Sequence, residues 1–258
     1  MAGASRLAEF RRDLAWLSPS HRFSLLALCV LVILVATLSS AMPLLRDLER
    51  ATLDVLTASS AELVETDKRI VLIVYTDETL ANTRQISPMD RTILAKALEQ
   101  IDRLDPKAVA IDILFDSPQD DDPLLQSVLR HMSVPTFLAS ANNPEIVTFE
   151  QRQFLRHYLT AVGGTGPVRP ASIQLAVDND GVLRRWPQRG KGTPPLLASA
   201  LTQATASGNP RFDDYLGPIR FKLSSTSDRP VFDKIPIDLF ADPEMAPVLA
   251  EFVRALPA

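Results

Sequence analysis

The stretch from Arg69 to Asp122 constrains the fold of this chain more than any other part of its sequence. Two short apolar runs, residues 70–75 and 108–114, lie on either side of a segment whose apolar residues recur at helical spacing. This order predicts a strand, a helix and a second strand, and the right-handed crossover rule makes the two strands parallel. The predicted fold class is therefore α/β, with a central, largely parallel sheet that is flanked by helices.

The helix between these strands has clear start and stop signals. Ser87 is the predicted N-cap, Pro88 takes the first helical position and Asp90 places an acid at the third. The pair Asp105-Pro106 ends the helix. A further helix is expected from Asp122-Pro123 to about residue 132, followed by a third strand over residues 134–139.

The second half of the chain predicts a hairpin added to this sheet. Residues 172–177 and 182–186 flank an Asp-Asn-Asp-Gly turn, in which Gly181 supplies the positive φ that such turns demand. Helices are expected over residues 148–159 and from Thr193 to about residue 206, and a strand over 218–223.

A long uncharged run sets the expected topology. The 23 residues from Phe23 to Leu45 contain no charged side chain, which predicts one N-terminal transmembrane helix over residues 23–45. Residues 1–22 carry four arginines against two acids, a net charge of +2, whereas the whole chain has a net charge of −4. A basic flank before the span places residues 1–22 in the cytoplasm and residues 67–258 outside the inner (cell) membrane. The alternatives to an uncleaved anchor are a signal peptide cleaved after Ala41 and a buried core helix.

Residues 46–66 are interpreted as a stalk helix that continues the span outward. Its apolar residues recur at helical spacing, and two interpretations stay open for them: packing on the chain's own domain, or pairing with a second copy as a homodimer. The apolar positions are Leu45, Leu48, Leu53 and Leu56.

Composition narrows the function classes. The net negative charge and the lack of a basic run argue against nucleic acid as a partner. The single cysteine, Cys29, excludes a disulfide framework within the chain and a cysteine-based zinc site. The three histidines stand far apart, so no metal and no cofactor is predicted.

Acidic residues follow both strands of the first unit. Asp77 and Glu78 come after the first strand, and Asp112 and Asp116 end the second. Because ligands of open α/β sheets bind at the carboxyl ends of strands, these four acids are candidate ligand-binding residues. Two other interpretations remain: a carboxylate site for Mg²⁺, or structural capping and pairing. No catalytic residue is assigned, since no nucleophile with a neighbouring base and no phosphate loop accompanies them.

Three arginines complete the set of candidate ligand-binding residues. Arg91 begins the helix after the first strand, and Arg184 and Arg185 follow the Asp-Asn-Asp-Gly turn. Arg184 and Arg185 could contact an anion, or one of them could point outward while the other pairs with an acid.

Over residues 44–240 the chain resembles the second class of CHASE domain, an extracellular sensory domain associated with adenylate cyclases and histidine kinases. The resemblance is carried by five segments in order: LRDLERATLDVLT, RIVLIVYTDETLA, RTILAKALEQIDRLDPKAVAIDILF with DDDPLL, DNDGVLRRWP and TPPLLASALT. The later VFDKIPIDLF also resembles this family. The resemblance implies a periplasmic or extracellular sensor of an unknown signal that feeds an intracellular output domain.

Two departures from the family pattern bear on this reading. The family has a tryptophan-proline pair before the arginine, where this chain has residues 86–90, Ile-Ser-Pro-Met-Asp. The family also continues with a Gly-Lys-led strand and further membrane helices, so the expectation is that the C-terminus of this chain is incomplete. Two function classes stay open: the sensory domain, or a membrane-anchored metal-dependent hydrolase that uses the carboxylates at the strand ends.

Overall fold

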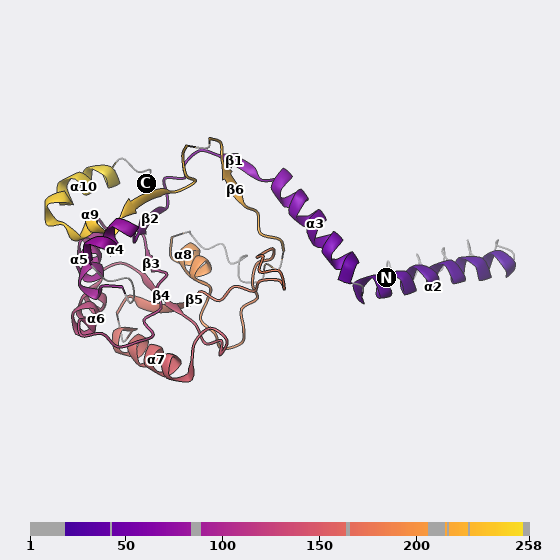
Figure 1. The fold of residues 1–258 in the computed structure, drawn as a ribbon, viewed down its shortest axis with the longest axis horizontal. Coiled ribbons are helices and arrows are strands. Elements are labelled where there is room, and N and C mark those ends of the chain that lie inside the picture. Colours follow the sequence, from indigo (N-terminus) through magenta and orange to yellow (C-terminus); the bar gives the residue numbers. More distant parts are fainter. Residues whose placement is uncertain are drawn as a thin grey trace, which may run out of the picture. The chain divides into compact units, whose positions relative to one another are not determined.

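The computed structural model describes residues 19–41, 43–83, 89–163, 166–205, 215, 217–226 and 228–254. The chain divides into two units, residues 1–61 and residues 62–258. In the first unit, helix α2 (Pro19–Ala41) is followed by helix α3 (Pro43–Ser59) (Figure 1). Proline lacks the N–H that would continue a helix and suits a first helical turn, which explains why a new helix begins at Pro43 within the predicted span.

The N-terminal predictions are met only in part. Among the residues described, no helix combines the length and the apolar character that a membrane crossing requires, so the predicted span is not confirmed. The predicted stalk helix over 46–66 ends at Ser59, where the hydroxyls of Ser59 and Ser60 donate to the carbonyls of Leu56 and Thr57. Residues 62–64 form a strand instead.

Within its described residues, the second unit contains three sets of parallel strands. Strand β3 (Val109–Ile111) pairs with β4 (Thr136–Ser140), which pairs with β5 (Val168–Ser172). Strand β2 (Val71–Val74) pairs with β7 (Asp233–Pro236), and β1 (Glu62–Val64) pairs with β6 (Lys222–Ser224). All of these pairs are parallel, which confirms the predicted α/β class with largely parallel strands.

One expected neighbour relation is wrong. The segments 70–75 and 108–114 are predicted to be parallel strands of one sheet, but β2 pairs with β7, which lies about 160 residues later in the sequence, and β3 pairs with β4. The crossover rule fixes the direction and hand of such a unit but leaves open which strands become neighbours.

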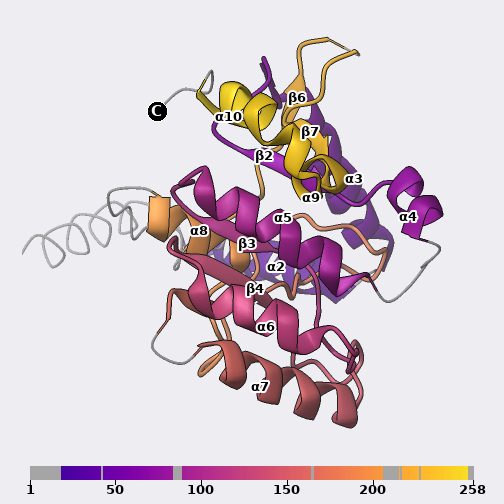
Figure 2. The same cartoon turned by 90° about the vertical axis from the view of Figure 1, so that its left-hand side faces the viewer.

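Helices cover both sides of the three-stranded sheet. On one side lie α5 (Arg91–Arg103), α6 (Asp122–His131) and α7 (Phe149–Gly163) in that order, and on the other lies α8 (Leu197–Thr205) (Figures 1 and 2). The remaining helices of the unit are α4 (Asp77–Thr83), α9 (Ile237–Ala241), the 3-10 helix η2 (Pro243–Met245) and α10 (Ala246–Arg254).

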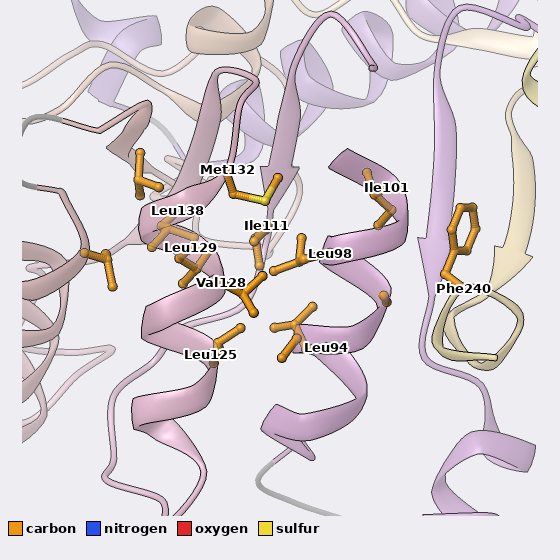
Figure 3. Close-up of a cluster of buried hydrophobic side chains, with 14 of the residues drawn as sticks. Leu94, Leu98, Ile101, Ile111, Leu125, Val128, Leu129, Met132, Leu138 and Phe240 are labelled. Carbon is orange, nitrogen blue, oxygen red and sulfur yellow. The ribbon is translucent and has the colours of Figure 1, made fainter. Parts of the chain in front are cut away.

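Helix α5 forms the centre of the core. Leu94 and Leu98 on one face of α5 point toward Leu125 and Leu129 of α6, and Phe240 of α9 lies on its other side (Figure 3). Each of these side chains is buried, and burying one contributes about 1.5–3 kcal/mol to folding. The apolar face predicted for this helix is therefore confirmed. Asp105, with a positive φ of 50°, and Pro106 end it as predicted.

The predicted hairpin is formed only at its turn. Gly181 has a φ of 78°, and the Asp178 N–H donates to the Val182 carbonyl at 3.0 Å. Beyond the turn the segments separate: β5 ends at Ser172, and Arg185 forms an antiparallel bridge with Pro218. The backbone that would have closed the hairpin therefore pairs with a segment more than 30 residues further along the chain.

Candidate functional site

The start of helix α5 holds a buried arginine. The helix begins at Arg91 and its N-cap is Asp90, whose carboxylate accepts from the N–H groups of Thr92 (2.8 Å) and Ile93 (3.2 Å). The prediction that Ser87 would cap the helix is therefore wrong, and Ser87 itself lies outside the described residues. Asp caps a helix as well as Ser does, and its negative charge interacts favourably with the helix dipole.

Arg91 is paired rather than open to a ligand. Its side chain is 2% exposed, and Nε donates to Oδ1 of Asp122 at 3.2 Å. Its guanidinium carbon lies 4.4 Å from the centre of the Phe115 ring, a cation–π geometry. Gln119 completes the surroundings: with its side-chain amide turned so that both ends find partners, its oxygen accepts from Nη2 of Arg91 at 3.2 Å and its nitrogen donates to the Met89 carbonyl at 3.1 Å.

These four residues, Arg91, Phe115, Gln119 and Asp122, form what we call the Arg91 cluster. The second carboxylate oxygen of Asp122 accepts from the backbone N–H of Gln119 at 2.9 Å, so both of its oxygens are used. Beside the cluster, the Thr92 hydroxyl donates to Asp121 at 3.0 Å. Two contacts thus join the first turns of α5 and α6. The cluster therefore fixes these helix starts to each other.

An aromatic layer extends the Arg91 cluster into α7. The rings of Phe115 and Tyr158 stack with centroids 4.9 Å apart, and Phe154 packs against Tyr158 at a tilt. The Tyr158 hydroxyl is buried and has no hydrogen-bond partner among the described residues. Burial, and then the negative charge of Asp122, raises the pKa of Tyr158 above its ordinary value.

A second polar group lies at the carboxyl ends of β2 and β7. Thr79 of α4 is fully buried, and its hydroxyl donates to Asp238 of α9 at 2.6 Å. The hydroxyl of Thr76 lies 3.0 Å from that of Thr79. The Tyr75 hydroxyl is buried nearby, and desolvation, followed by the charges of Asp90 and Asp238, raises the pKa of Tyr75 to about 12.

The four acids at the strand ends differ in their surroundings. Asp77 and Glu78 are exposed in the first turn of α4, and Asp112 is exposed after β3. Asp116 is half-buried and accepts from the side-chain amide of Gln151 at 2.7 Å. In the described part of the chain no three Asp, Glu, His or Cys residues group in a way that could hold a metal ion.

Arg184 and Arg185 differ in their surroundings. Arg184 is buried and donates to Asp178 (2.7 Å) and to both carboxylate oxygens of Asp180 (2.9 and 2.7 Å), while Arg185 is exposed. The hydrogen bond from Arg184 holds the pKa of Asp180 well below its usual range. Within this pair, Arg184 is therefore the arginine that binds acids and Arg185 is the exposed one.

The residues that sequence reasoning missed are the buried partners. Asp122 binds Arg91 and Thr79 binds Asp238, whereas the sequence pattern indicates only that Asp122 starts a helix. One signal is present in the sequence: Asp122 precedes Pro123 at a helix start, and carboxylates form strong, charge-assisted hydrogen bonds with arginine.

The chain was compared with family models, with curated proteins and with solved structures. No curated protein matches the chain, and no solved structure matches it. The family model of the CHASE2 domain matches residues 27–252, which include most of α2, all of α3 and the parallel α/β unit through most of α10. CHASE2 domains are extracellular sensory domains of signalling receptors and are not catalytic. This chain belongs to the CHASE2 domain family.

Proposed function

We propose that this chain is the signal-input part of a bacterial transmembrane receptor whose output domain is an adenylate cyclase or a histidine kinase. The observation that carries the proposal is the family match over residues 27–252, because it joins the uncharged N-terminal run to the α/β unit in one sensory domain. The input unit binds a signal outside the cell, and the segment from Phe23 to Leu45 transmits the change across the inner membrane.

The topology follows from the charge pattern. The run from Phe23 to Leu45 spans the membrane, residues 1–22 with their net charge of +2 stay in the cytoplasm, and residues 67–258 lie in the periplasm or outside the cell.

The exposed acids are the proposed contacts for the signal. Asp77, Glu78 and Asp112 are exposed after the carboxyl ends of β2 and β3, where ligands of parallel sheets bind. Arg185 is exposed as well. Arg91, Asp116 and Arg184 have an indirect role in this proposal. Each forms a hydrogen bond with a neighbouring side chain and so holds the surrounding backbone in place.

We also propose that the receptor is a homodimer held by α3. Leu45, Leu48 and Val55 are exposed on α3, and their spacings of three and seven residues match the a and d positions of a coiled coil. Two copies that insert into one membrane in the same orientation have parallel α3 helices, so Leu45, Leu48 and Val55 of one copy can pack against the same residues of the other.

Reporter fusions at the C-terminus test the proposed topology. Alkaline phosphatase folds to its active form outside the cytoplasm, whereas green fluorescent protein fluoresces when it is made inside. The proposal predicts phosphatase activity and no fluorescence for fusions of the full chain. Fluorescence without phosphatase activity would refute an external domain. As a matched control, a fusion placed after Arg22 must fluoresce.

A further inference from the structure

We infer that Tyr75, Asp90 and Asp238 form a binding site for the primary ammonium group of a small ligand, at the carboxyl ends of β2 and β7. We call these three residues the ammonium site. The inference rests on the sensory role proposed above and names the chemical class of the signal. Ligands of open α/β sheets bind at this end of parallel strands.

Three elements bring the side chains of the ammonium site together. Strands β2 and β7 end side by side, since Val74 is in register with Pro236, so Tyr75 and Asp238 follow the ends of neighbouring strands. Helix α9, which carries Asp238, packs against α5, whose N-cap is Asp90 (Figure 3). Burial, and then the charges of Asp90 and Asp238, raise the pKa of Tyr75, which agrees with two carboxylates near one hydroxyl.

The hydroxyl of Tyr75 lacks a partner. Its oxygen is buried and makes no hydrogen bond of normal geometry with any described residue, although the backbone N–H of Asp90 lies near it. A buried polar group without a partner is costly and therefore rare in folded proteins. A ligand that bonds to this hydroxyl and to the two carboxylates would supply the missing partner.

Each acid of the site keeps one carboxylate oxygen for a ligand. Oδ1 of Asp90 accepts from the N–H groups of Thr92 and Ile93, and Oδ2 of Asp238 accepts from the Thr79 hydroxyl at 2.6 Å. Among the described residues, no hydrogen bond reaches the other oxygen of either acid. Both acids are half-buried, so each is held from within the unit and still reaches solvent.

Charge selects the class of ligand. In the described part of the chain neither Asp90 nor Asp238 forms an ion pair, and the neighbouring Arg91 donates to Asp122 instead. Two carboxylates near each other repel, and a positively charged ligand relieves that repulsion. A primary ammonium carries one positive charge and three N–H donors, which match three acceptors: the two carboxylate oxygens and the Tyr75 hydroxyl oxygen.

A metal ion or an anion suits the ammonium site less well. Calcium takes about six to eight oxygen ligands, and magnesium demands near-octahedral geometry. The described residues offer no group of three acids, histidines or cysteines here, and the hydroxyls of Thr76 and Thr79 already bond within the unit. An anion would meet the negative charges of both Asp90 and Asp238. The donor set therefore favours an organic cation that carries N–H groups.

Thermal unfolding of the purified full chain in detergent tests the inference, with n-butylammonium as the probe. The thermal midpoint should rise with the concentration of the probe, by about 3 °C at ten times its Kd. The cation n-butyltrimethylammonium has the same charge but no N–H donor, so its shift should be much smaller, and butyrate should give none. Equal shifts with the two cations, or no shift with n-butylammonium, would overturn the inference.

Variants assign the shift to the ammonium site. Asp238→Asn keeps an oxygen that can accept from Thr79 but removes the charge, and Tyr75→Phe removes only the hydroxyl. Each should weaken the binding of n-butylammonium at least about five-fold. Glu244→Gln, which removes an exposed acid from the nearby η2, should leave the Kd unchanged. Circular dichroism checks that the variants keep the fold. A folded Asp238→Asn variant that binds the probe as tightly as the wild type would contradict the inference.

The binding measurement does not depend on membrane topology, so this inference and the proposed function can fail separately. If n-butylammonium binds but the reporter fusions place the α/β unit in the cytoplasm, the ammonium site stands and the external sensor is wrong. If the fusions place the unit outside the cytoplasm and n-butylammonium does not bind, only the ammonium site is wrong.

Discussion

Arg91 Nε donates to Oδ1 of Asp122 over 3.2 Å, and these two residues are the first residues of α5 and α6. The contact places a charge pair where two helices start, with side chains only 2% and 9% exposed. In a family of sensory domains this position could be read as a ligand contact. The structure gives it a different role, since both carboxylate oxygens of Asp122 already accept hydrogen bonds within the unit.

The first prediction concerns this pair. Asp122→Ala leaves the Arg91 charge buried without its partner, so the free energy of unfolding should fall by about 3–5 kcal/mol. Replacing both residues together, Arg91→Met with Asp122→Leu, should cost much less, because no unpaired charge remains. The thermal midpoint of the purified full chain measures both. If the double variant were as unstable as Asp122→Ala, the loss of stability would not come from an unpaired buried charge, and the prediction would be wrong.

The second prediction concerns the cap of α5. Asp90→Ala removes the acceptor for two backbone N–H groups and should lower the free energy of unfolding by about 1 kcal/mol. Asp90→Asn keeps an acceptor and should lose only part of this. Thermal unfolding of both variants against the wild type measures the difference. Equal losses for Ala and Asn would point to the charge of Asp90 rather than to its hydrogen bonds.

The third prediction follows from the raised pKa of Tyr75 and concerns the stability of the folded chain at alkaline pH. Its pKa in the folded chain is about 12, above its ordinary value of about 10 in an unfolded chain. Above pH 10 the unfolded chain releases this proton while the folded chain keeps it, so stability should be constant below about pH 10 and fall between about pH 10 and 12. Tyr75→Phe should flatten this fall in thermal midpoint, and Tyr215→Phe, at an exposed position, serves as the control. An unchanged slope for Tyr75→Phe would contradict the buried hydroxyl.

Arg184 and Asp180 predict the behaviour in acid. The pKa of Asp180 is lowered by the hydrogen bond from Arg184, so the stabilisation is present above the ordinary carboxyl pKa of about 4 and is lost as the pH falls toward the lower folded value. Asp180→Asn should therefore reduce the difference in thermal midpoint between pH 6 and pH 3, and the exposed Asp120→Asn should not. A full acid dependence in Asp180→Asn would exclude this pair as its source.

The sequence predicted those parts of the fold that depend on local patterns. The apolar runs became β2, β3 and β4, and the helical spacing after Asp90 became α5, since both signals follow from burial of neighbouring residues. Partner choice depends on contacts between distant segments. Nothing in residues 70–75 indicates that β2 will pair with Asp233–Pro236, and the short strand β1 was read as the end of a helix.

The site was predicted less well for the same reason. Asp120, Asp121 and Asp122 form one acidic run, yet only Asp122 is buried, because only its position in α6 faces Arg91. Likewise Arg184 and Arg185 are adjacent in sequence, and the first is buried against Asp178 and Asp180 while the second is exposed. Which residue of a charged run is buried and paired depends on the helix or strand that packs against it. The sequence of the run itself does not indicate which element that is.

The most direct test of the central proposal, an external sensory unit behind a membrane span, is labelling of single cysteines in intact cells. In the Cys29→Ala background, Glu145→Cys places a thiol at an exposed position of the α/β unit, and Ala8→Cys places one in the N-terminal segment. A membrane-impermeant maleimide should label Glu145→Cys in intact cells and Ala8→Cys only after the cells are opened. Labelling of Ala8→Cys in intact cells, with Glu145→Cys protected until lysis, would contradict the proposal.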